Sequence, residues 1–199
     1  VYKLPEGNPQ SRGKPFVNIL PLDPGETITT FMPVPEDQEE ADKLFLMFAT
    51  SSGTVRRNAI ADFERVQSNG KIAMKLEEGE RLVGVSIARE GQDILLGSAM
   101  GKAMRFPIED IRVFQGRDSR GVRGIKLAEG DRVISMTIVG HVDLDTEERD
   151  SYIKRANAMR RAVEEGAAGT DLGDMSEERF TELGAAEQMI LAIANDGFG

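Results

Sequence analysis

The sequence contains no cysteine, no tryptophan and a single histidine, His141. The lack of cysteine excludes disulfide bonds and zinc sites with thiolate ligands. One histidine is too few for a histidine-rich metal site or a histidine-based catalytic triad, so we expect no metal site. Aromatic residues make up 6% of the chain, too few for platforms that stack single-stranded bases. No apolar run approaches the roughly 18 residues of a membrane span, and no signal peptide is present.

The 199 residues are enough for one or two domains. The chain has no initiator methionine, and residues 197–199 have the pattern of the middle of an element. We therefore expect a fragment of a larger soluble, cytoplasmic protein.

The net charge of −9 is unevenly distributed along the chain. Residues 141–187 hold 13 acidic and 6 basic residues, a net charge of −7, which leaves 21 acidic and 19 basic residues elsewhere, a net charge of −2. Binding to nucleic acid requires a basic surface. The overall acidity therefore does not exclude such binding by the nearly neutral remainder.

Internal repetition is the strongest pattern in the sequence. An apolar run that ends in a glycine turn occurs at residues 44–53, 94–101 and 189–197. Each run is typical of a buried strand that enters a tight hairpin. Gly53 and Gly101 are 48 residues apart, and four short strands in about 50 residues is the size of a propeller-type blade.

Three further elements recur in the same order after each apolar run: a second strand, a basic glycine turn, and a Gly-acid turn that leads into an apolar strand. The second strand occurs at residues 1–5, 55–57 and 103–107. The basic glycine turn occurs at residues 11–14, 68–71 and 119–123. The Gly-acid turn with its apolar strand occurs at residues 24–32, 78–87 and 129–139. We therefore expect an all-β, propeller-like fold with a partial blade at residues 1–34 and blades at residues 35–88 and 89–140.

One repeat step is twice as long as the others. Gly101 and Gly197 are 96 residues apart, and the excess coincides with the acidic residues 141–187. Asp145 and the residues after it indicate a capped helix start, apolar residues then recur at helical spacing, and residues 176–183 indicate a second helix. We interpret this insertion as a solvated helical excursion between strands, with a partner-binding or regulatory role as the alternative. Residues 188–199 are expected to be the first strand of the next blade.

The basic residues also recur at matching positions of the repeats. A toroid of blades brings one repeat position to one rim, so recurrent cations predict an arc that can hold bent duplex DNA through its phosphates. The alternative is that lysine and arginine protect exposed strand edges. The recurrent cations are Lys3, Arg12, Lys14, Arg57, Lys71, Lys75, Arg105, Arg120, Arg123 and Lys126. The shortage of aromatic residues predicts binding that tolerates many sequences and depends on how easily the DNA bends.

Several runs of residues resemble the C-terminal domain of the DNA gyrase A subunit family. These runs are residues 2–7, 11–15, 17–22, 49–57 and 118–127. The resemblance covers residues 1–140 and 188–199 and leaves the insertion outside it. It implies a partial six-bladed β-pinwheel, in which neighbouring blades exchange strands and the rim wraps duplex DNA.

The resemblance also implies partners and a role in a larger enzyme. Gyrase is an ATP-hydrolysing type II topoisomerase that introduces negative supercoils; its B subunit uses ATP and Mg²⁺, and a second A subunit completes a heterotetramer in the bacterial cytoplasm, associated with the nucleoid. No cofactor, membrane contact or catalytic residue is expected in this fragment, so neither Tyr2 nor Tyr152 is assigned a catalytic role. Carried over by position, Arg56 joins the ten recurrent cations as an expected DNA contact.

Two features keep other interpretations open. The family's Gln-Arg-Arg-Gly-Gly-Lys-Gly box is absent, and residues 10–14 and 67–71 are only degenerate versions of it. The C-terminal domain of the topoisomerase IV A subunit shares the blade pattern. The acidic insertion favours a different class, a propeller-like protein-interaction module. A stand-alone enzyme is disfavoured because no catalytic constellation is present.

Overall fold

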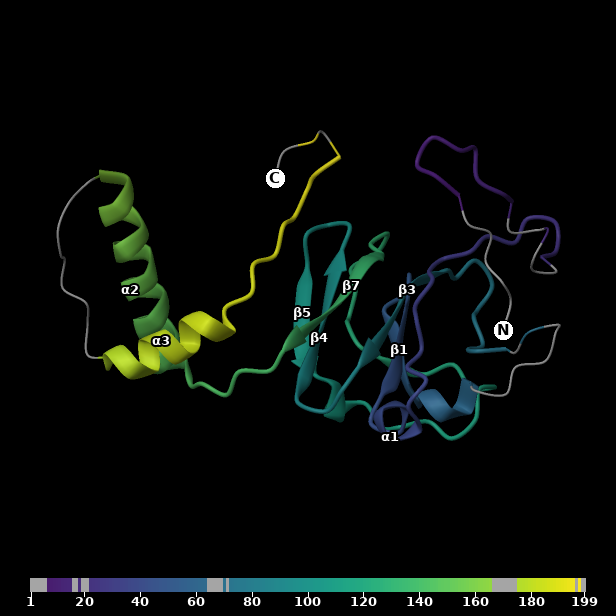
Figure 1. The fold of residues 1–199 in the computed structure, drawn as a ribbon, viewed down its shortest axis with the longest axis horizontal. Helices are drawn as coiled ribbons and strands as arrows, with labels where there is room; N and C mark the ends of the chain where they lie inside the picture. Colours follow the sequence, from purple (N-terminus) through teal and green to yellow (C-terminus); the bar gives the residue numbers. More distant parts are fainter. Residues whose placement is uncertain are drawn as a thin grey trace. The chain divides into compact units, whose positions relative to one another are not determined.

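The computed structural model describes residues 7–15, 18, 22–63, 70, 72–165, 175–195 and 197. The chain forms two compact units (Figure 1). The blade unit comprises Val1–Glu90 and Ile94–Ile138, and the helical unit comprises Gly91–Asp93 and Val139–Gly199.

A four-stranded sheet combines strands from both predicted blades. Its order is β3-β1-β2-β6, with β1 at Phe45–Thr50, β2 at Thr54–Ala59, β3 at Leu82–Ala88 and β6 at Val122–Arg123. The first three strands belong to the repeat at residues 35–88, whereas β6 belongs to the next repeat. All three pairings are antiparallel, and Val122 of β6 lies opposite Val55 of β2. A strand of one repeat therefore completes the sheet of the repeat before it, which is the strand exchange that the family resemblance implies.

Strand β1 is buried on both faces, which explains its uninterrupted apolar sequence. Side chains alternate between the faces of a strand. Leu46 and Phe48 pack into one core cluster with Leu44, whereas Met47 and Ala49 pack into another. The second cluster also contains Ile94, Leu96, Ile125 and Val133 from the next repeat. The two repeats of the blade unit thus share one hydrophobic core.

A second sheet has the order β5-β4-β7. Its strands are β4 at Gln92–Ser98, β5 at Ala103–Pro107 and β7 at Val133–Gly140. Strand β5 lies at the edge of this sheet, and its first three residues are exposed. The connections contain the short helix α1 (Gln38–Ala41) and the 3-10 helices η2 (Ile60–Phe63) and η3 (Ile108–Asp110).

Two predicted strands do not form. Residues 28–32 and the described part of 188–199 are extended but belong to no sheet. A strand requires a hydrogen-bonded neighbour. Among the described residues, β3 pairs with β1 and β7 pairs with β4, whereas no strand pairs with residues 28–32 or 188–195.

The helical unit contains α2 (Thr146–Glu165) and α3 (Glu177–Ala186). The Asp145 carboxylate accepts a hydrogen bond from the Glu148 amide at 2.8 Å, and Ser176 caps α3 by accepting from the Arg179 amide at 3.2 Å. Both helices of the insertion and the capped start at Asp145 are therefore confirmed.

The two helices are joined mainly by polar contacts from arginine. Arg155 is 4% exposed, lies 4.2 Å from the Phe180 ring centroid, donates to the Met175 carbonyl at 2.9 Å and pairs with Glu177. Tyr152 packs on Phe180 with ring centroids 5.2 Å apart. Because these partners lie within the insertion, the helical hairpin is held by its own residues.

Candidate nucleic-acid interface

Three expected DNA contacts lie on one continuous surface segment. Arg120, Arg123 and Lys126 are exposed and follow one another at intervals of three residues; we call them the cation strip. Between them, the Gly124 amide donates to the Gly53 carbonyl at 2.8 Å and Ile125 is 2% exposed, whereas Val122 is 37% exposed. The segment is therefore anchored to the blade unit at Gly124 and Ile125, and its three cations are exposed to solvent.

Arg56 does not lie on this surface. Its side chain is fully buried, and its guanidinium donates to the carbonyls of Gly116, Arg117 and Ser119 and to the Asn58 side chain. Burial lowers the pKa of Arg56, while the nearby carboxylates of Asp118 and Asp62 act in the opposite direction. The position of Arg56 is therefore incompatible with the predicted phosphate contact, because its donors already hold the loop that precedes the cation strip.

Arg57 is also interior, at 4% exposure. Its guanidinium lies 3.7 Å from the Phe45 ring centroid, 3.4 Å from the Ile108 carbonyl and 3.5 Å from the Glu90 carboxylate. A cation over an aromatic face in a desolvated site stabilises packing. We correct the expectation for Arg57 in the same way, since Ile108 and the rest of the following repeat cover it.

Other basic residues lie next to the cation strip. The amide of the exposed residue Lys75 donates to the Ser119 carbonyl at 3.5 Å, which brings the backbones of two repeats together. Lys102 was not predicted as a contact, yet its ammonium donates to the Lys126 carbonyl at 2.5 Å. Arg105 is exposed on β5.

The remaining expected contacts come from the first part of the chain and from the turn at residues 68–71. Arg12 and Lys14 are exposed, in a segment that begins with a turn in which the Ser11 amide donates to the Asn8 carbonyl at 3.0 Å. Lys3 and Lys71 lie outside the described residues. These four positions stay predictions.

An acidic residue links the Gly-acid turns at residues 78–87 and 129–139 to a hairpin, a role that the sequence interpretation missed. Glu80 accepts hydrogen bonds from Thr50 and Ser52 of the β1–β2 hairpin. At the equivalent position, Asp131 accepts from the Met100 amide at 3.0 Å in the β4–β5 hairpin. The recurrence of an acid directly after the glycine of this turn was the signal that could have revealed the link.

The pKa values of both acids reflect these contacts. Partial burial alone would raise the pKa of Glu80, but the hydrogen bonds from Ser52 and Thr50 outweigh it and lower the pKa. A hydrogen bond from Ser98, with the amides of Met100 and Arg132, lowers the pKa of Asp131. Both groups therefore act as charged acceptors.

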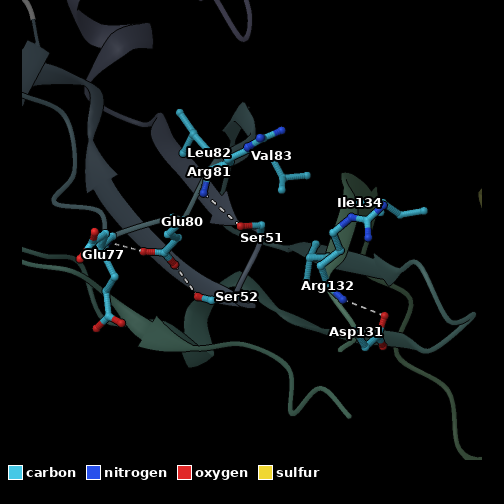
Figure 2. A pocket seen from close by; sticks show the side chains of 13 residues that line it. Ser51, Ser52, Glu77, Glu80, Arg81, Leu82, Val83, Asp131, Arg132 and Ile134 are labelled. Atoms are coloured by element: carbon cyan, nitrogen blue, oxygen red, sulfur yellow. Dashed lines mark hydrogen bonds between the residues drawn. The ribbon is translucent and has the colours of Figure 1, made fainter. Parts of the chain in front are cut away.

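A cleft of about 850 Å³ opens beside these turns (Figure 2). Arg81 and Arg132 line it at equivalent repeat positions, and their carbonyls accept from the amides of Ser51 and Ala99, each at 2.8 Å. The acidic side chains lining it are those of Glu77, Glu78, Glu80 and Asp131. Because its carboxylates outnumber its guanidinium groups, this cleft is unsuited to phosphate.

The helical unit contains a further polar pair. The His141 ring nitrogen Nδ1 lies 2.8 Å from a carboxylate oxygen of Asp93, whose side chain is 2% exposed. His141 is 41% exposed, and its partner is a buried acid. Within the described residues, no group of three His, Asp or Glu side chains could hold a metal ion. Within the same residues, no helix combines the length and apolar character needed to cross a membrane.

The matched segments of a known family coincide with the repeats. A family model described as "DNA gyrase C-terminal domain, beta-propeller" matches residues 1–35, 45–89 and 92–139. The chain belongs to this DNA gyrase C-terminal domain family. The predicted fold class, a propeller-like all-β pinwheel, is confirmed, and the match ends where the helical insertion begins.

Curated relatives are named as the A subunit of DNA gyrase. The relative from Rickettsia bellii is 46% identical over 100% of this chain, the one from Granulibacter bethesdensis 41% identical over 100%, and the one from Escherichia coli 41% identical over 78%. The chain spans about a fifth of their length, 22%, 23% and 17% respectively. Relatives that match the whole chain also match its helical insertion, so the resemblance extends further than the sequence interpretation placed it.

Solved structures of gyrase and topoisomerase IV C-terminal domains have the same fold. A gyrase A C-terminal domain is 25% identical with a TM-score of 0.55, covering 65% of this chain and 42% of that one. A topoisomerase IV C-terminal domain is 23% identical with a TM-score of 0.58, covering 64% of this chain and 38% of that one. At this sequence identity, the match to topoisomerase IV supports the fold only.

Proposed function

We propose that this chain binds duplex DNA as part of the wrapping domain of a gyrase A subunit, with the cation strip contacting phosphates. The observation that carries the proposal is the exposed run of Arg120, Arg123 and Lys126, built on a repeated turn of a gyrase C-terminal domain fold. Lys75 and Lys102 belong to the same part of the surface, because the Lys75 amide donates to the Ser119 carbonyl and the Lys102 ammonium donates to the Lys126 carbonyl.

The chemistry of this surface suits phosphate contact rather than base reading. Guanidinium and ammonium groups that neutralise phosphates release condensed counterions, so binding depends steeply on salt and little on sequence. Among the described residues, no recognition helix that could enter a major groove lies beside the strip. Preference among DNA sequences is then set by the cost of bending.

Within this proposal, the chain is part of a larger enzyme assembly. The gyrase A subunit would pair with a second copy of itself, and with two B subunits it would form a type II topoisomerase of the bacterial cytoplasm. ATP and Mg²⁺ used by the B subunits would drive negative supercoiling. This chain would contribute DNA binding and wrapping, and the chemistry would lie in other parts of the assembly.

The test substitutes the three residues of the cation strip in the full-length protein that contains this chain and measures DNA binding against salt concentration. The variant Arg120→Gln/Arg123→Gln/Lys126→Gln is expected to weaken binding to a linear duplex by about tenfold and to reduce the salt slope by roughly 0.9 for each lost contact. The matched control Arg149→Gln/Lys154→Gln/Arg161→Gln removes the same charge from α2 and should leave both quantities nearly unchanged. Equal effects of the two variants, or a flat salt response of the unaltered protein, would refute the proposal.

A second candidate function is a protein-interaction module, favoured by the helical unit. Helix α2 exposes Ile153, Met159 and Val163, of which Val163 is 84% exposed. If protein binding were the main function, deletion of residues 141–187 would abolish activity and charge reversal in the cation strip would not. The opposite pattern supports DNA wrapping. Between gyrase and topoisomerase IV we favour gyrase, because the curated relatives described above carry that name.

A further inference from the structure

The first residue of the cation strip already has an acidic partner. The Arg120 guanidinium lies 2.5 Å from the Glu77 carboxylate, and both side chains are 60% exposed. Glu77 belongs to the repeat at residues 35–88 and Arg120 to the next one. In that next repeat Ala128 takes the place of Glu77, whereas Asp23 occupies the matching position before Gly25, so the acid is present in two of the three turns.

Backbone contacts hold the two partners in place. The Glu77 amide donates to the Glu80 carboxylate at 2.8 Å, and Glu80 is in turn bound by Thr50 and Ser52. On the other side, the buried Arg56 holds carbonyls of the loop at residues 116–119, and the Lys75 amide donates to the Ser119 carbonyl. The approach of Glu77 to Arg120 therefore follows from the way the repeats join.

A carboxylate and a phosphate compete for the same guanidinium donors. Arginine presents a planar fork of N–H groups that matches either anion. The Glu77–Arg120 pair is exposed on both sides, and exposed ion pairs are weak, so a phosphate can displace the carboxylate. Once displaced, Glu77 remains as a negative charge close to the DNA backbone.

We propose that Glu77 is an intramolecular competitor for DNA phosphate at Arg120 and sets the affinity of this part of the rim. The inference rests on the proposed DNA binding. Removal of the carboxylate frees Arg120 and removes a repulsion, so Glu77→Gln tightens DNA binding, whereas Arg120→Gln removes the contact itself.

The matched control is the neighbouring acid. Glu78 is exposed in the same turn, and no ion pair to it is among those of the described residues. Both Glu77→Gln and Glu78→Gln remove one negative charge, so they change general electrostatics equally. Affinity for a linear duplex of about 150 base pairs, roughly one persistence length, is measured with the full-length protein at low and at physiological salt. Glu77→Gln is expected to tighten binding about two- to fivefold, and Glu78→Gln by clearly less.

A double-variant cycle completes the experiment. In the background of Arg120→Gln, Glu77→Gln should give no more tightening than Glu78→Gln. Equal tightening by the two single variants, or a Glu77→Gln effect that persists without Arg120, overturns the inference while leaving DNA binding intact. Failure of the unaltered protein to bind the duplex would instead remove the proposed function. Far-UV circular dichroism checks that each variant is folded.

Discussion

Two adjacent arginines at the centre of the blade unit, Arg56 and Arg57, are held by carbonyl oxygens and aromatic rings instead of solvent. Arg56 acts as a bridge, because its guanidinium belongs to β2 while its carbonyl partners belong to the next repeat. A buried charge is costly unless its donors are satisfied. The donors of Arg56 are satisfied in this way, whereas the buried Nε of Arg57 has no hydrogen-bond partner among the described residues. Arg56 therefore fixes the loop from which the cation strip emerges.

Replacement of Arg56 should loosen that loop. Arg56→Leu leaves three carbonyls without their donor, and we expect a loss of about 2–4 kcal/mol in the local opening free energy. Hydrogen exchange of residues 116–125 measures it. The control Arg120→Gln alters an exposed side chain and should cost less than about 0.5 kcal/mol. Unchanged exchange in Arg56→Leu would contradict the bridging role.

Glu80 predicts a pH dependence with a definite sign. Its hydrogen bonds from Ser52 and Thr50 outweigh partial burial and lower its pKa in the folded state. A folded-state pKa below the unfolded value of about 4.3 gives stability that is present at neutral pH and lost as the pH falls through the folded pKa. Glu80→Gln should therefore destabilise the blade unit by about 1 kcal/mol at pH 7, and by progressively less as the pH falls below the unfolded-state pKa and through the folded one.

Urea denaturation of the variant and the unaltered protein across this pH range tests the effect of Glu80. Glu78→Gln serves as control, because Glu78 lies in the same turn but is not an acceptor for the hairpin. A difference between Glu80→Gln and the unaltered protein that is constant with pH would show that lost packing, and not ionisation, is responsible.

At the scale of elements, β6 is two residues long yet joins two repeats. It approaches β2 so closely that a Cβ atom on Gly121 would clash with the Val55 carbonyl oxygen, and Gly121 has a φ of 125°. Both the space and the backbone conformation require glycine here.

Gly121→Ala should separate β6 from β2. We expect a local destabilisation of about 3 kcal/mol or more, together with weaker DNA binding because the cation strip loses its support. Gly116→Ala is the control: Gly116 has a φ of 78°, but a Cβ atom added there would meet no other atom within 4 Å, so about 1 kcal/mol of backbone strain is expected. Hydrogen exchange across β2 and β6 measures the pairing. Equal effects of the two substitutions would contradict the close-approach explanation.

The elements of the blade were predictable because each strand leaves a local pattern. The apolar runs at residues 44–53 and 94–101 became β1 and β4, and Asp145 marked the start of α2. Whether arginines at equivalent repeat positions are buried or exposed was not predictable. Arg57 and Arg105 occupy the same repeat position, yet one is buried by the following repeat and the other is exposed on β5. Burial of a recurrent cation depends on what the neighbouring repeat places over it, which no local pattern records.

At the scale of the whole molecule, the hydrophobic core lies in the blade unit and most of the negative charge lies in the helical unit. Both hydrophobic core clusters consist of residues from 32 to 138, so the described helices of the insertion contribute nothing to them. The insertion in turn carries most of the acidic excess. It is held together by its own contacts, such as Arg155 with Glu177 and Arg179 with Glu148 at 2.6 Å.

This partition predicts that the insertion can be removed without unfolding the blades. Replacement of residues 142–187 by a short Gly-Ser linker keeps His141 and both core clusters, so the urea midpoint of the β-sheet signal should stay within the error of the measurement. DNA binding by the full-length protein should be retained or become tighter, because a net charge of about −7 is removed and like charge repels phosphate within a Debye length. The control Arg155→Ala removes the contact of Arg155 with Phe180 but keeps the insertion. Its urea midpoint should equal that of the deletion variant, and its affinity for DNA should not increase. Loss of DNA binding on deletion would contradict this partition and make the insertion part of the DNA interface.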